Sequence, residues 1–250
     1  MSEPSDRHDP QGPDAPGTVE TAPAGTVSAA LRSRQSARAF LDTPVPEATV
    51  VELLELARWS PSGSNIQPWC VHALTGEPLR ALLREVGTAL VSGPPPAQEY
   101  QYYASPLPEP YLGRRRANGW GLYGHLGIGK GDRAASAAQA MRNFAFFDAP
   151  VGLFFFIDAA LERGSWLDYG MFLQSLMLAA RERGLHTCPQ AAWLPYHALV
   201  RRHCGEGEDR TLVCGMALGH LDATAHVNGF RTPRMPVESF FSAHGFSETP

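Results

Sequence analysis

Two arginines of the segment RQSARAF, Arg34 and Arg38, are the first residues of the chain whose types and spacing could do chemistry. Guanidinium groups four residues apart can converge on one anion at a helix end or in a tight turn, and their planar donor sets match the oxygens of a phosphate. Ser36 lies between them and could add a hydroxyl donor. Taken alone, the pair indicates either an anion-binding site or a salt-bridged surface.

Further arginines lie in two other parts of the chain. Arg231 and Arg234 belong to the segment RTPRMP near the end, and Arg114–Arg116 form a continuous run in YLGRRR. A run of this kind is usually a solvated surface, and its functional interpretation is a cationic wall that attracts an anionic substrate. Both interpretations of Arg114–Arg116 stay open.

The stretch SPSGSNIQPW at 60–69 is rich in turn-forming residues and lies between a helical pattern and an apolar run. A simple connection needs only a few such residues. Small side chains let a backbone approach a ligand closely, and amide or hydroxyl groups can donate to the polar edge of that ligand. The stretch therefore predicts a backbone that is shaped for binding.

Two other candidate motifs fail on chemical grounds. The segment GHLGIGKG at 124–131 nearly matches a phosphate-binding loop, but Gly131 has no hydroxyl group for Mg²⁺. The His and Cys residues at 186–188 and at 203–204 lack the spacing of metal ligands. The sequence therefore predicts neither a nucleoside triphosphatase nor a metal site.

Composition limits the class of protein. The chain has 250 residues, of which 44% are apolar, and this is enough for one domain with a substantial core. A net charge of −4 gives no general attraction to nucleic acid or to an anionic membrane, so a small-molecule partner is favoured. No apolar run reaches the roughly 18 residues that a membrane span needs. Four cysteines without a C-x-x-C pair indicate reduced thiols and a cytoplasmic protein.

Hydrophobic periodicity predicts the elements that must position the candidate residues. Residues 1–25 have almost nothing to bury and are predicted to form a disordered tail, and 92–131 is the least regular part of the chain. Helices are predicted over 26–31, 46 to about 59, 77–91, 132–147, 165–184 and 195–204. Strands are predicted over 69–74, 151–157 and 211–219.

Six segments, taken in order, resemble the FMN-dependent nitroreductase family from about residue 28 to the end. They are RQSARAF, a P-x-P helix start, PSGSNIQPW, GLHTCPQAAW, LVCGMALGH and NGFRTPRMP. The segments FFDAPVGLFFFID and LDYGMFLQSLMLAARERGLHTCPQ, together with the long insertion, are most similar to the nitrobenzoate reductase type.

The resemblance implies an α+β fold with three α/β/α layers around a central mixed, mainly antiparallel sheet. It implies a homodimer with FMN at the interface between the two copies. It further implies that residues 26–250 form the FMN-binding domain, with an insertion at 92–131 and an extended C-terminal arm at 222–250.

The same resemblance implies which residues hold the flavin. The phosphate and ribityl tail fall to Arg34, Gln35, Ser36, Arg38, Arg231 and Arg234. A loop contributed across the dimer interface supplies Pro61, Ser62, Gly63, Ser64 and Asn65. The segment Pro189, Gln190 and Ala191 follows, in which the backbone near Gln190 and Ala191 faces the flavin N5 and no catalytic side chain is implied. The substrate pocket is assigned to Tyr103, Tyr111, Arg115 and Tyr123.

The implied activity is a ping-pong transfer of two electrons from NADH or NADPH, through bound FMN, to a small acceptor such as a nitroaromatic or a quinone. Two alternatives stay open: an FMN-dependent dehydrogenase or reductive dehalogenase acting on another small molecule, and a non-catalytic flavin-binding protein. The sequence does not separate NADH from NADPH and does not name the acceptor or the proton donor.

Overall fold

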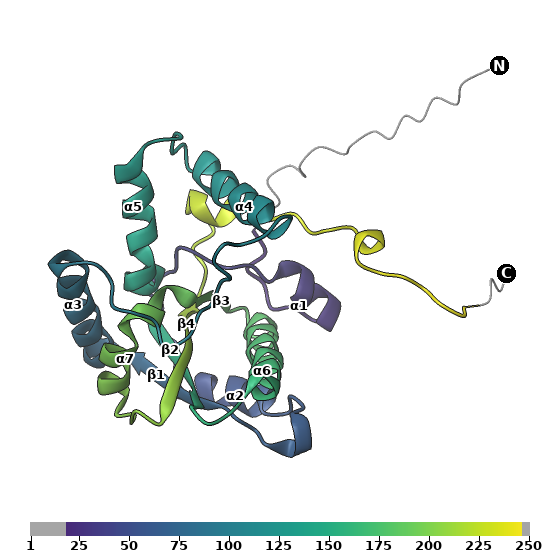
Figure 1. The fold of residues 1–250 in the computed structure, drawn as a ribbon, viewed down its shortest axis with the longest axis horizontal. Helices are drawn as coiled ribbons and strands as arrows, with labels where there is room; N and C mark the ends of the chain where they lie inside the picture. The colour runs from purple at the N-terminus through teal and green to yellow at the C-terminus, as the bar shows by residue number, and fades with distance from the viewer. Residues whose placement is uncertain (1–18, 247–250) are drawn as a thin grey trace.

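The computed structural model describes residues 19–246, which are built around a four-stranded antiparallel sheet (Figure 1). The strands are β1 (Cys70–Thr75), β2 (Val151–Asp158), β3 (His186–Gln190) and β4 (Arg210–Gly219), and they lie in the order β1-β2-β4-β3. The one parallel pairing in this part of the chain is an isolated bridge between Ser36 and Thr187 at the β3 edge. The sheet is therefore mainly antiparallel, as predicted.

Strand β2 explains why the sheet lies between two helical layers. All its residues except the last are buried, so both of its faces are covered. Phe154 and Phe156 belong to one hydrophobic cluster, and Leu153, Phe155 and Ile157 belong to a second one. Because successive side chains of a strand point to opposite faces, the two clusters are the cores on the two sides of the sheet. This confirms the predicted three-layer α+β architecture.

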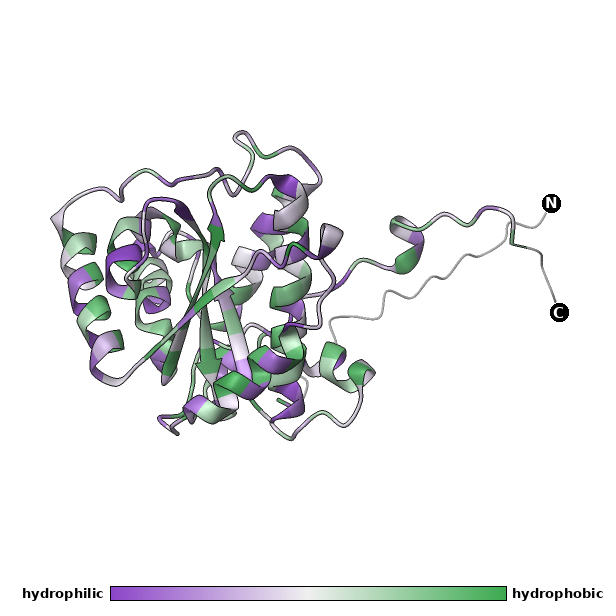
Figure 2. Ribbon diagram, turned by 90° about the horizontal axis from the view of Figure 1, so that it is seen from below, coloured by the Kyte–Doolittle hydropathy of each residue, from purple (hydrophilic) through white to green (hydrophobic). Residues whose placement is uncertain are grey.

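Two helices cover each face of the sheet. The amphipathic helix α2 (Glu47–Ala57) and the long helix α6 (Arg163–Glu182) pack over one face, and α3 (Gly76–Ser92) and α7 (His197–Cys204) pack over the other. The short helix α1 (Val27–Ser33) lies beside α6. Figure 2 shows hydrophobic strands in the middle of the molecule and helices with hydrophilic segments around them.

Helix α4 (Tyr111–His125) lies in the region that was predicted to be irregular, so that prediction was wrong there. Four glycines in its sequence, YLGRRRANGWGLYGH, hide the helical periodicity and lower the intrinsic helix propensity. A short helix α5 (Arg133–Met141) follows α4.

Two further differences from the predicted elements have local causes. The helix predicted over 132–147 is α-helical only as far as Met141 and continues as the 3₁₀ segment η2 (Arg142–Asp148), in which Phe146 and Phe147 adopt left-handed backbone angles (φ 47° and 56°) and bury both rings. Strand β3 was not predicted, since it has only five residues and includes Pro189. Pro189 is tolerated there because β3 lies at an edge of the sheet.

The start of the described chain packs against the body of the molecule, whereas its end does not (Figure 1). The tail predicted at 1–25 lies outside the described residues as far as residue 18, but Ala24 is buried and its N–H donates to the carbonyl of Arg181 (2.9 Å), so the packed part of the chain begins before Thr26. At the other end, the last described part of the chain, which includes the 3₁₀ turn η5 (Val237–Ser239), extends away from the body of the molecule (Figure 1). No helix in the described part of the chain is both long enough and apolar enough to cross a membrane.

Candidate functional site

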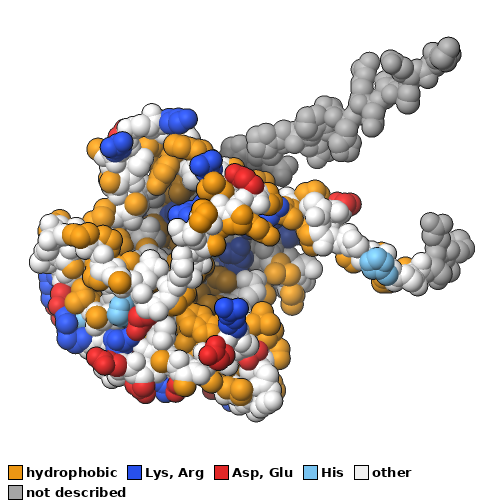
Figure 3. All heavy atoms as spheres, in the orientation of Figure 1, with side chains coloured by type: hydrophobic (Ala, Val, Ile, Leu, Met, Phe, Trp, Pro, Cys, Tyr) orange, Lys and Arg blue, Asp and Glu red, His pale blue; other side chains and the backbone are white. Residues whose placement is uncertain are grey.

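A cavity of about 900 Å³ lies where three separate segments meet: the chain after α1, one side of α4, and the start of the C-terminal arm. In the space-filling view, Lys and Arg side chains gather in the hollow of this face (Figure 3). We call residues 34–38 the first cluster and residues 231–234 the last cluster. All the predicted cofactor residues of these two clusters line the cavity: Arg34, Gln35, Ser36, Arg38, Arg231 and Arg234. Residues almost 200 positions apart are thus brought to one site.

The charge of this cavity is strongly positive. Its lining contains Arg32, Arg34, Arg38, Arg114, Arg231 and Arg234, and no Asp or Glu among the described residues. None of these arginines forms an ion pair with any residue between 19 and 246. Burial lowers the pKa of Arg34, and the nearby charges of Arg234 and Arg231 lower it further. The arginines repel one another and no described acidic residue of the lining neutralises them, so binding of an anion here would be favourable.

The guanidinium of Arg231 is hydrogen-bonded to other residues of the cavity wall. Its Nη1 donates to Oε1 of Gln35 (2.7 Å) and to the carbonyl oxygen of Ser33 (3.3 Å), and its Nη2 donates to the carbonyl oxygen of Arg32. These bonds fix the chain that carries Gln35. Arg231 is therefore a positioning residue for the first arginine cluster.

Asn228 ties the first cluster to the C-terminal segment. Its Oδ1 accepts a hydrogen bond from the backbone N–H of Arg38 (2.7 Å), and its Nδ2 donates to the carbonyl oxygens of Ala39 and Asp222 (2.8 Å each). Its own carbonyl oxygen accepts from Nε2 of Gln35 (3.0 Å). Asn228 is buried, so every polar group of its side chain is satisfied inside the protein.

The first cluster is also anchored to the sheet. The N–H of Ala37 donates to the carbonyl oxygen of Thr187 (3.1 Å), beside the Ser36–Thr187 bridge. This places the arginine segment along β3, whose last residues are Pro189 and Gln190. The predicted flavin segment at 189–191 therefore lies at the end of β3, and the predicted phosphate residues lie beside the same strand.

The side chain of Gln190 is held by a hydrogen bond within the protein. Its Nε2 donates to the carbonyl oxygen of Asn143 (2.7 Å), and the residue is buried. Its Oε1 is buried and has no hydrogen-bond partner among the described residues. Pro189 before it is exposed, and Ala191 after it begins the 3₁₀ turn η3 (Ala191–Tyr196).

The predicted loop at 61–65 does not line the arginine cavity of its own chain. The N–H of Gly63 donates to Oδ2 of Asp168 in the first half of α6 (3.1 Å), whereas Arg181 near the end of α6 contacts Ser33 beside the first cluster. Arg181 lies 13 positions after Asp168 in α6, which is roughly 20 Å at a rise of about 1.5 Å per residue. The loop and the cavity thus lie toward opposite ends of α6.

The loop nevertheless has a defined shape. Ser64, Asn65 and Gln67 have left-handed backbone angles (φ 50°, 59° and 52°), and the N–H of Gln67 donates to Oγ of Ser62 (3.0 Å). Left-handed angles at residues other than glycine cost free energy and often mark functional loops. Ile66 is exposed, so this loop presents a fixed backbone to the outside of the chain.

The structure separates the four residues assigned to the substrate pocket from the cavity lining. The guanidinium of Arg115 lies over the ring of Tyr103, 4.5 Å from its centroid, and neither residue lines the cavity. Tyr111 and Tyr123 are on α4 but are not lining residues either. Instead α4 contributes Arg114, Ala117, Asn118 and Gly121.

The four lining residues of α4 are spaced in the sequence as the residues of one helical face. Their positions follow the i, i+3, i+4, i+7 spacing of one helical face. Because the glycines hide the helix at 111–125, the sequence alone did not show that these four positions share one face. Once α4 is known, Arg114 rather than Arg115 is the arginine of the run that faces the cavity.

Helix α4 is joined closely to the first part of the C-terminal arm. The rings of His125 and His226 are stacked with centroids 4.1 Å apart, and each Nε2 pairs with the backbone carbonyl of the other residue (2.7 and 2.6 Å). A Cβ on Gly121 would lie 3.0 Å from the ring of Phe230. The glycine therefore allows α4 to approach the C-terminal segment and close the cavity.

Comparison with known proteins decides the family. A family model described as "Nitroreductase family" matches residues 31–220. The chain is 43% identical over 220 residues to the 4-nitrobenzoate reductase of Pseudomonas putida, covering 87% of this chain and 95% of that protein. The chain belongs to the nitroreductase family.

Solved structures agree with this nitroreductase assignment. The FMN and NADPH-dependent nitroreductase NfnB from sphigopyxis sp. strain HMH has a TM-score of 0.86 and 40% identity, covering 88% of this chain and all of that one. The FMN-dependent nitroreductase NfnB from Mycobacterium smegmatis, solved in complex with NADPH, has a TM-score of 0.82 and 31% identity over 87% of this chain and 97% of that one. The nitroreductase-like fold predicted from the sequence is confirmed.

Proposed function

We propose that this nitroreductase-family chain binds FMN at the arginine cavity and catalyses the reduction of small nitroaromatic compounds by NADPH or NADH. The observation that carries the proposal is the set of six cavity arginines that no described acidic residue neutralises. A flavin phosphate is a compact dianion, which such a set can hold. The relatives named above support the cofactor, the reductant and the class of acceptor.

The residues present fit this cofactor. Arg34, Arg38 and Arg234 would bind the phosphate, and the hydroxyl of Ser36 would add a donor, whereas Arg231 keeps the segment at 32–35 in place. When bound, FMN supplies the chemistry of accepting a hydride from the nicotinamide and passing two electrons to the acceptor. The protein supplies binding, orientation and fixed charge.

Any contribution from Gln190 to the flavin ring would come from its backbone. Nε2 of its side-chain amide donates to Asn143, which fixes the orientation of the side chain. A backbone N–H that faces developing negative charge stabilises it without changing its own protonation state. We therefore assign Gln190 and Ala191 a backbone role and assign no side chain as a proton donor.

We further propose that the functional unit is a homodimer. The shaped loop at 61–65 bonds to the first half of α6, whereas the arginine segment adjoins the end of α6, so a second copy is the natural place for the loop's contacts with a cavity. Apolar residues in three regions support an interface because their side chains are exposed in a single chain: Trp59, Ile66, Leu167, Val237, Phe240, Phe241 and Phe246. Exposed large apolar side chains of this kind can be covered by contact with a second copy of the chain.

The acceptor would enter beside α4, whose Arg114 and Asn118 line the cavity. A guanidinium at this place suits an acceptor that carries a carboxylate, such as the 4-nitrobenzoate in the name of the Pseudomonas putida relative. Tyr103, Tyr111, Arg115 and Tyr123 lie on or next to α4 and remain proposed as outer parts of the acceptor pocket. A cytoplasmic location, where NADPH is available, is consistent with four free cysteines.

The test is to purify the protein, measure its flavin content and follow oxidation of NADPH and NADH with 4-nitrobenzoate, nitrobenzene and a quinone. We expect stoichiometric FMN, oxidation of a reduced nicotinamide, and faster turnover of 4-nitrobenzoate than of nitrobenzene. A colourless protein that also fails to bind added FMN would contradict the proposal. Flavin binding without any turnover would favour the non-catalytic alternative.

A further inference from the structure

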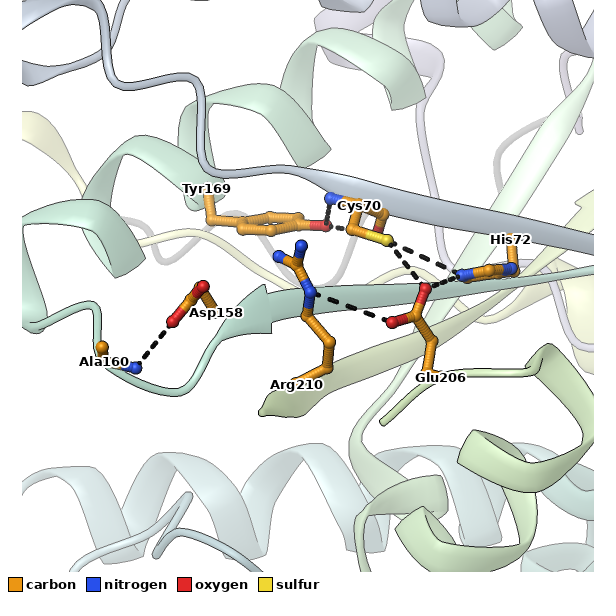
Figure 4. Close-up of polar contacts among 7 residues, drawn as sticks. All are labelled: Cys70, His72, Asp158, Ala160, Tyr169, Glu206 and Arg210. Carbon is orange, nitrogen blue, oxygen red and sulfur yellow. Dashed lines mark hydrogen bonds and ion pairs between the residues drawn. The ribbon is translucent and has the colours of Figure 1, made fainter. Parts of the chain in front are cut away.

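Three potential ligand atoms converge on one point near the other edge of the sheet. Sγ of Cys70 lies 3.6 Å from Nε2 of His72 and 3.3 Å from Oε1 of Glu206, and the last two atoms are 2.6 Å apart (Figure 4). All three lie within 4.8 Å of one another. A thiol, an imidazole and a carboxylate are the three common kinds of zinc ligand in proteins.

The fold places these side chains together for identifiable reasons. Cys70 and His72 are two residues apart in β1, so they point to the same face of the strand. Glu206 directly follows Gly205, whose left-handed conformation (φ 74°) ends α7. The N–H of Glu206 donates to the carbonyl oxygen of Arg201 (3.0 Å), and that of Gly205 to Arg202 (3.3 Å), which is a Schellman cap. The backbone of each ligand is therefore fixed.

Two of the three distances between the atoms are close to those around a tetrahedral zinc ion, and the third is shorter. With Zn–S about 2.3 Å and Zn–N or Zn–O about 2.05 Å, the tetrahedral edges are about 3.6 Å between S and N or O, and about 3.3 Å between N and O. The observed S–N and S–O separations are 3.6 and 3.3 Å. The N–O pair, at 2.6 Å, would open by less than about 1 Å, which side-chain rotation can supply.

We propose that Cys70, His72 and Glu206 form a binding site for a zinc ion, with the fourth coordination position left for water or a small ligand. Three protein ligands and one exchangeable position are typical of accessible zinc sites rather than of closed structural ones. The side chains of His72 and Glu206 are 26% and 17% exposed, so an ion can reach them. On binding, the thiol proton is released and the cysteine binds as thiolate.

The arrangement does not suit a nucleophilic cysteine. In such a site one imidazole nitrogen activates the thiol and the other is oriented by a third group. Here the same nitrogen of His72, Nε2, contacts both Cys70 and Glu206. All three groups aim at a common point between them, which is the geometry of a metal site.

Neighbouring residues hold the ligands without occupying their donor atoms. The hydroxyl of Tyr169 bonds to both backbone groups of Cys70 (3.3 and 2.9 Å), and the ring of His72 packs edge-on against Phe156. Nε of Arg210 is 3.8 Å from Oε2 of Glu206, the oxygen that faces away from the cluster (Figure 4). That neighbour lowers the affinity for a cation but leaves Oε1 available.

The zinc site is independent of the proposed flavin site. Its ligands are on β1 and on the turn before β4, whereas the arginine cavity adjoins β3, and β1 and β3 are the two opposite edges of the sheet. Three strand spacings of about 4.8 Å separate these edges. Failure of either proposal therefore leaves the other intact.

The test uses the purified full-length protein after treatment with a chelator and dialysis. Zn²⁺ binding is measured by competition with a metal indicator, and Co²⁺ is added as a spectroscopic substitute. We expect saturable binding of one Zn²⁺ per chain and a thiolate-to-cobalt charge-transfer band. Cys70→Ala, His72→Gln and Glu206→Gln should each weaken Zn²⁺ binding at least tenfold, with unchanged FMN content.

The matched control is His203→Gln, because His203 pairs with Glu85 at 2.8 Å in a histidine–carboxylate contact on the same face of the protein. It should leave Zn²⁺ binding unchanged. Circular dichroism checks the folding of each variant, and Zn²⁺ should also raise the melting temperature of the wild-type protein through mass action. Absence of saturable Zn²⁺ binding by the wild type, or wild-type Zn²⁺ affinity in all three ligand variants, would overturn the proposal.

Discussion

Oδ1 of Asn228 accepts a hydrogen bond of 2.7 Å from the backbone N–H of Arg38, a residue 190 positions earlier in the chain. This contact lets the arginine segment and the C-terminal segment share one cavity wall. Because Asn228 is buried and makes two further bonds through Nδ2, its loss leaves several backbone groups without partners.

We predict that Asn228→Ala lowers the free energy of unfolding by about 2 to 4 kcal/mol and weakens FMN binding. Urea titration with and without FMN measures both effects. Ala223→Ser, at an exposed position of the same segment, should change the free energy of unfolding by less than about 0.5 kcal/mol. Equal effects of the two substitutions would show that Asn228 does not brace the cavity.

Arg34 and Arg231 should respond differently to substitution. Burial and neighbouring positive charges lower the pKa of Arg34, so its charge is unfavourable until an anion binds. Arg34→Met should therefore leave the stability of flavin-free protein unchanged or higher while FMN affinity falls at least tenfold. Arg231→Met removes bonds to Gln35, Ser33 and Arg32 and should lower stability even without FMN. Thermal melts of flavin-free protein distinguish the two outcomes, and identical losses would refute the division of roles.

The glycines of α4 provide a test of how closely this helix must approach the C-terminal segment. Gly119 and Gly124 have open space where a Cβ would be, so replacing either with alanine should stabilise the protein by about 0.5 to 1 kcal/mol. A Cβ on Gly121 would lie 3.0 Å from Phe230, so Gly121→Ala should lose that gain and weaken FMN binding. If all three substitutions stabilise equally, α4 and Phe230 are not in close contact in solution.

His186 should make stability depend on pH. Burial, with a further contribution from the charge of Arg181, lowers its pKa to about 3 in the folded protein, against about 6.5 in the unfolded chain. Its contribution is fully present above pH 6.5. As pH falls toward 3, the unfolded chain takes up a proton that the folded protein does not, and stability falls by up to about 1.4 kcal/mol per pH unit.

His186→Gln should remove this part of the pH dependence, whereas His244→Gln at an exposed position should not. The free energy of unfolding is measured at several pH values between 4 and 7 for all three proteins. Parallel curves for the wild type and His186→Gln would contradict the prediction.

Mixing two defective proteins tests whether one site uses residues of both copies. Arg34→Ala impairs the cavity, and the double variant Ser62→Ala with Asn65→Ala impairs the shaped loop. In an equal mixture, half of the dimers are mixed and half of the sites in these are intact, so activity should recover to about a quarter of the wild-type level. No recovery after verified subunit exchange would indicate that loop and cavity act within one chain.

The sequence allowed prediction of those features that local pattern or residue type determines. The continuous apolar run of β2 predicted a strand covered on both faces. The family resemblance, rather than a local pattern, brought Arg234 together with Arg34 and Arg38, and the three residues line one cavity. In contrast, α4 was missed because glycines obscure its periodicity, and with it Arg114. The short edge strand β3 contains a proline, which argues against a strand until its edge position is known.

Other features depend on contacts that no local pattern reveals. The role of Arg231 follows from bonds to residues almost 200 positions away. Cys70, His72 and Glu206 meet only because β1 and the turn after α7 are neighbours in space, since His72 and Glu206 are 134 positions apart in the chain. The sequence showed a cysteine and a histidine in strand spacing, but their third partner required the fold.

The most direct test of the flavin assignment compares binding of FMN and of riboflavin, which lacks the phosphate, to the wild type and to Arg34→Ala and Arg234→Ala. Dissociation constants are measured by quenching of flavin fluorescence with flavin-free protein. We predict that the wild type binds FMN at least 10²-fold more tightly than riboflavin, and that each substitution weakens FMN binding at least tenfold with less than about twofold change for riboflavin. Equal affinity for the two flavins, or equal losses for both in the variants, would contradict a phosphate site formed by these arginines.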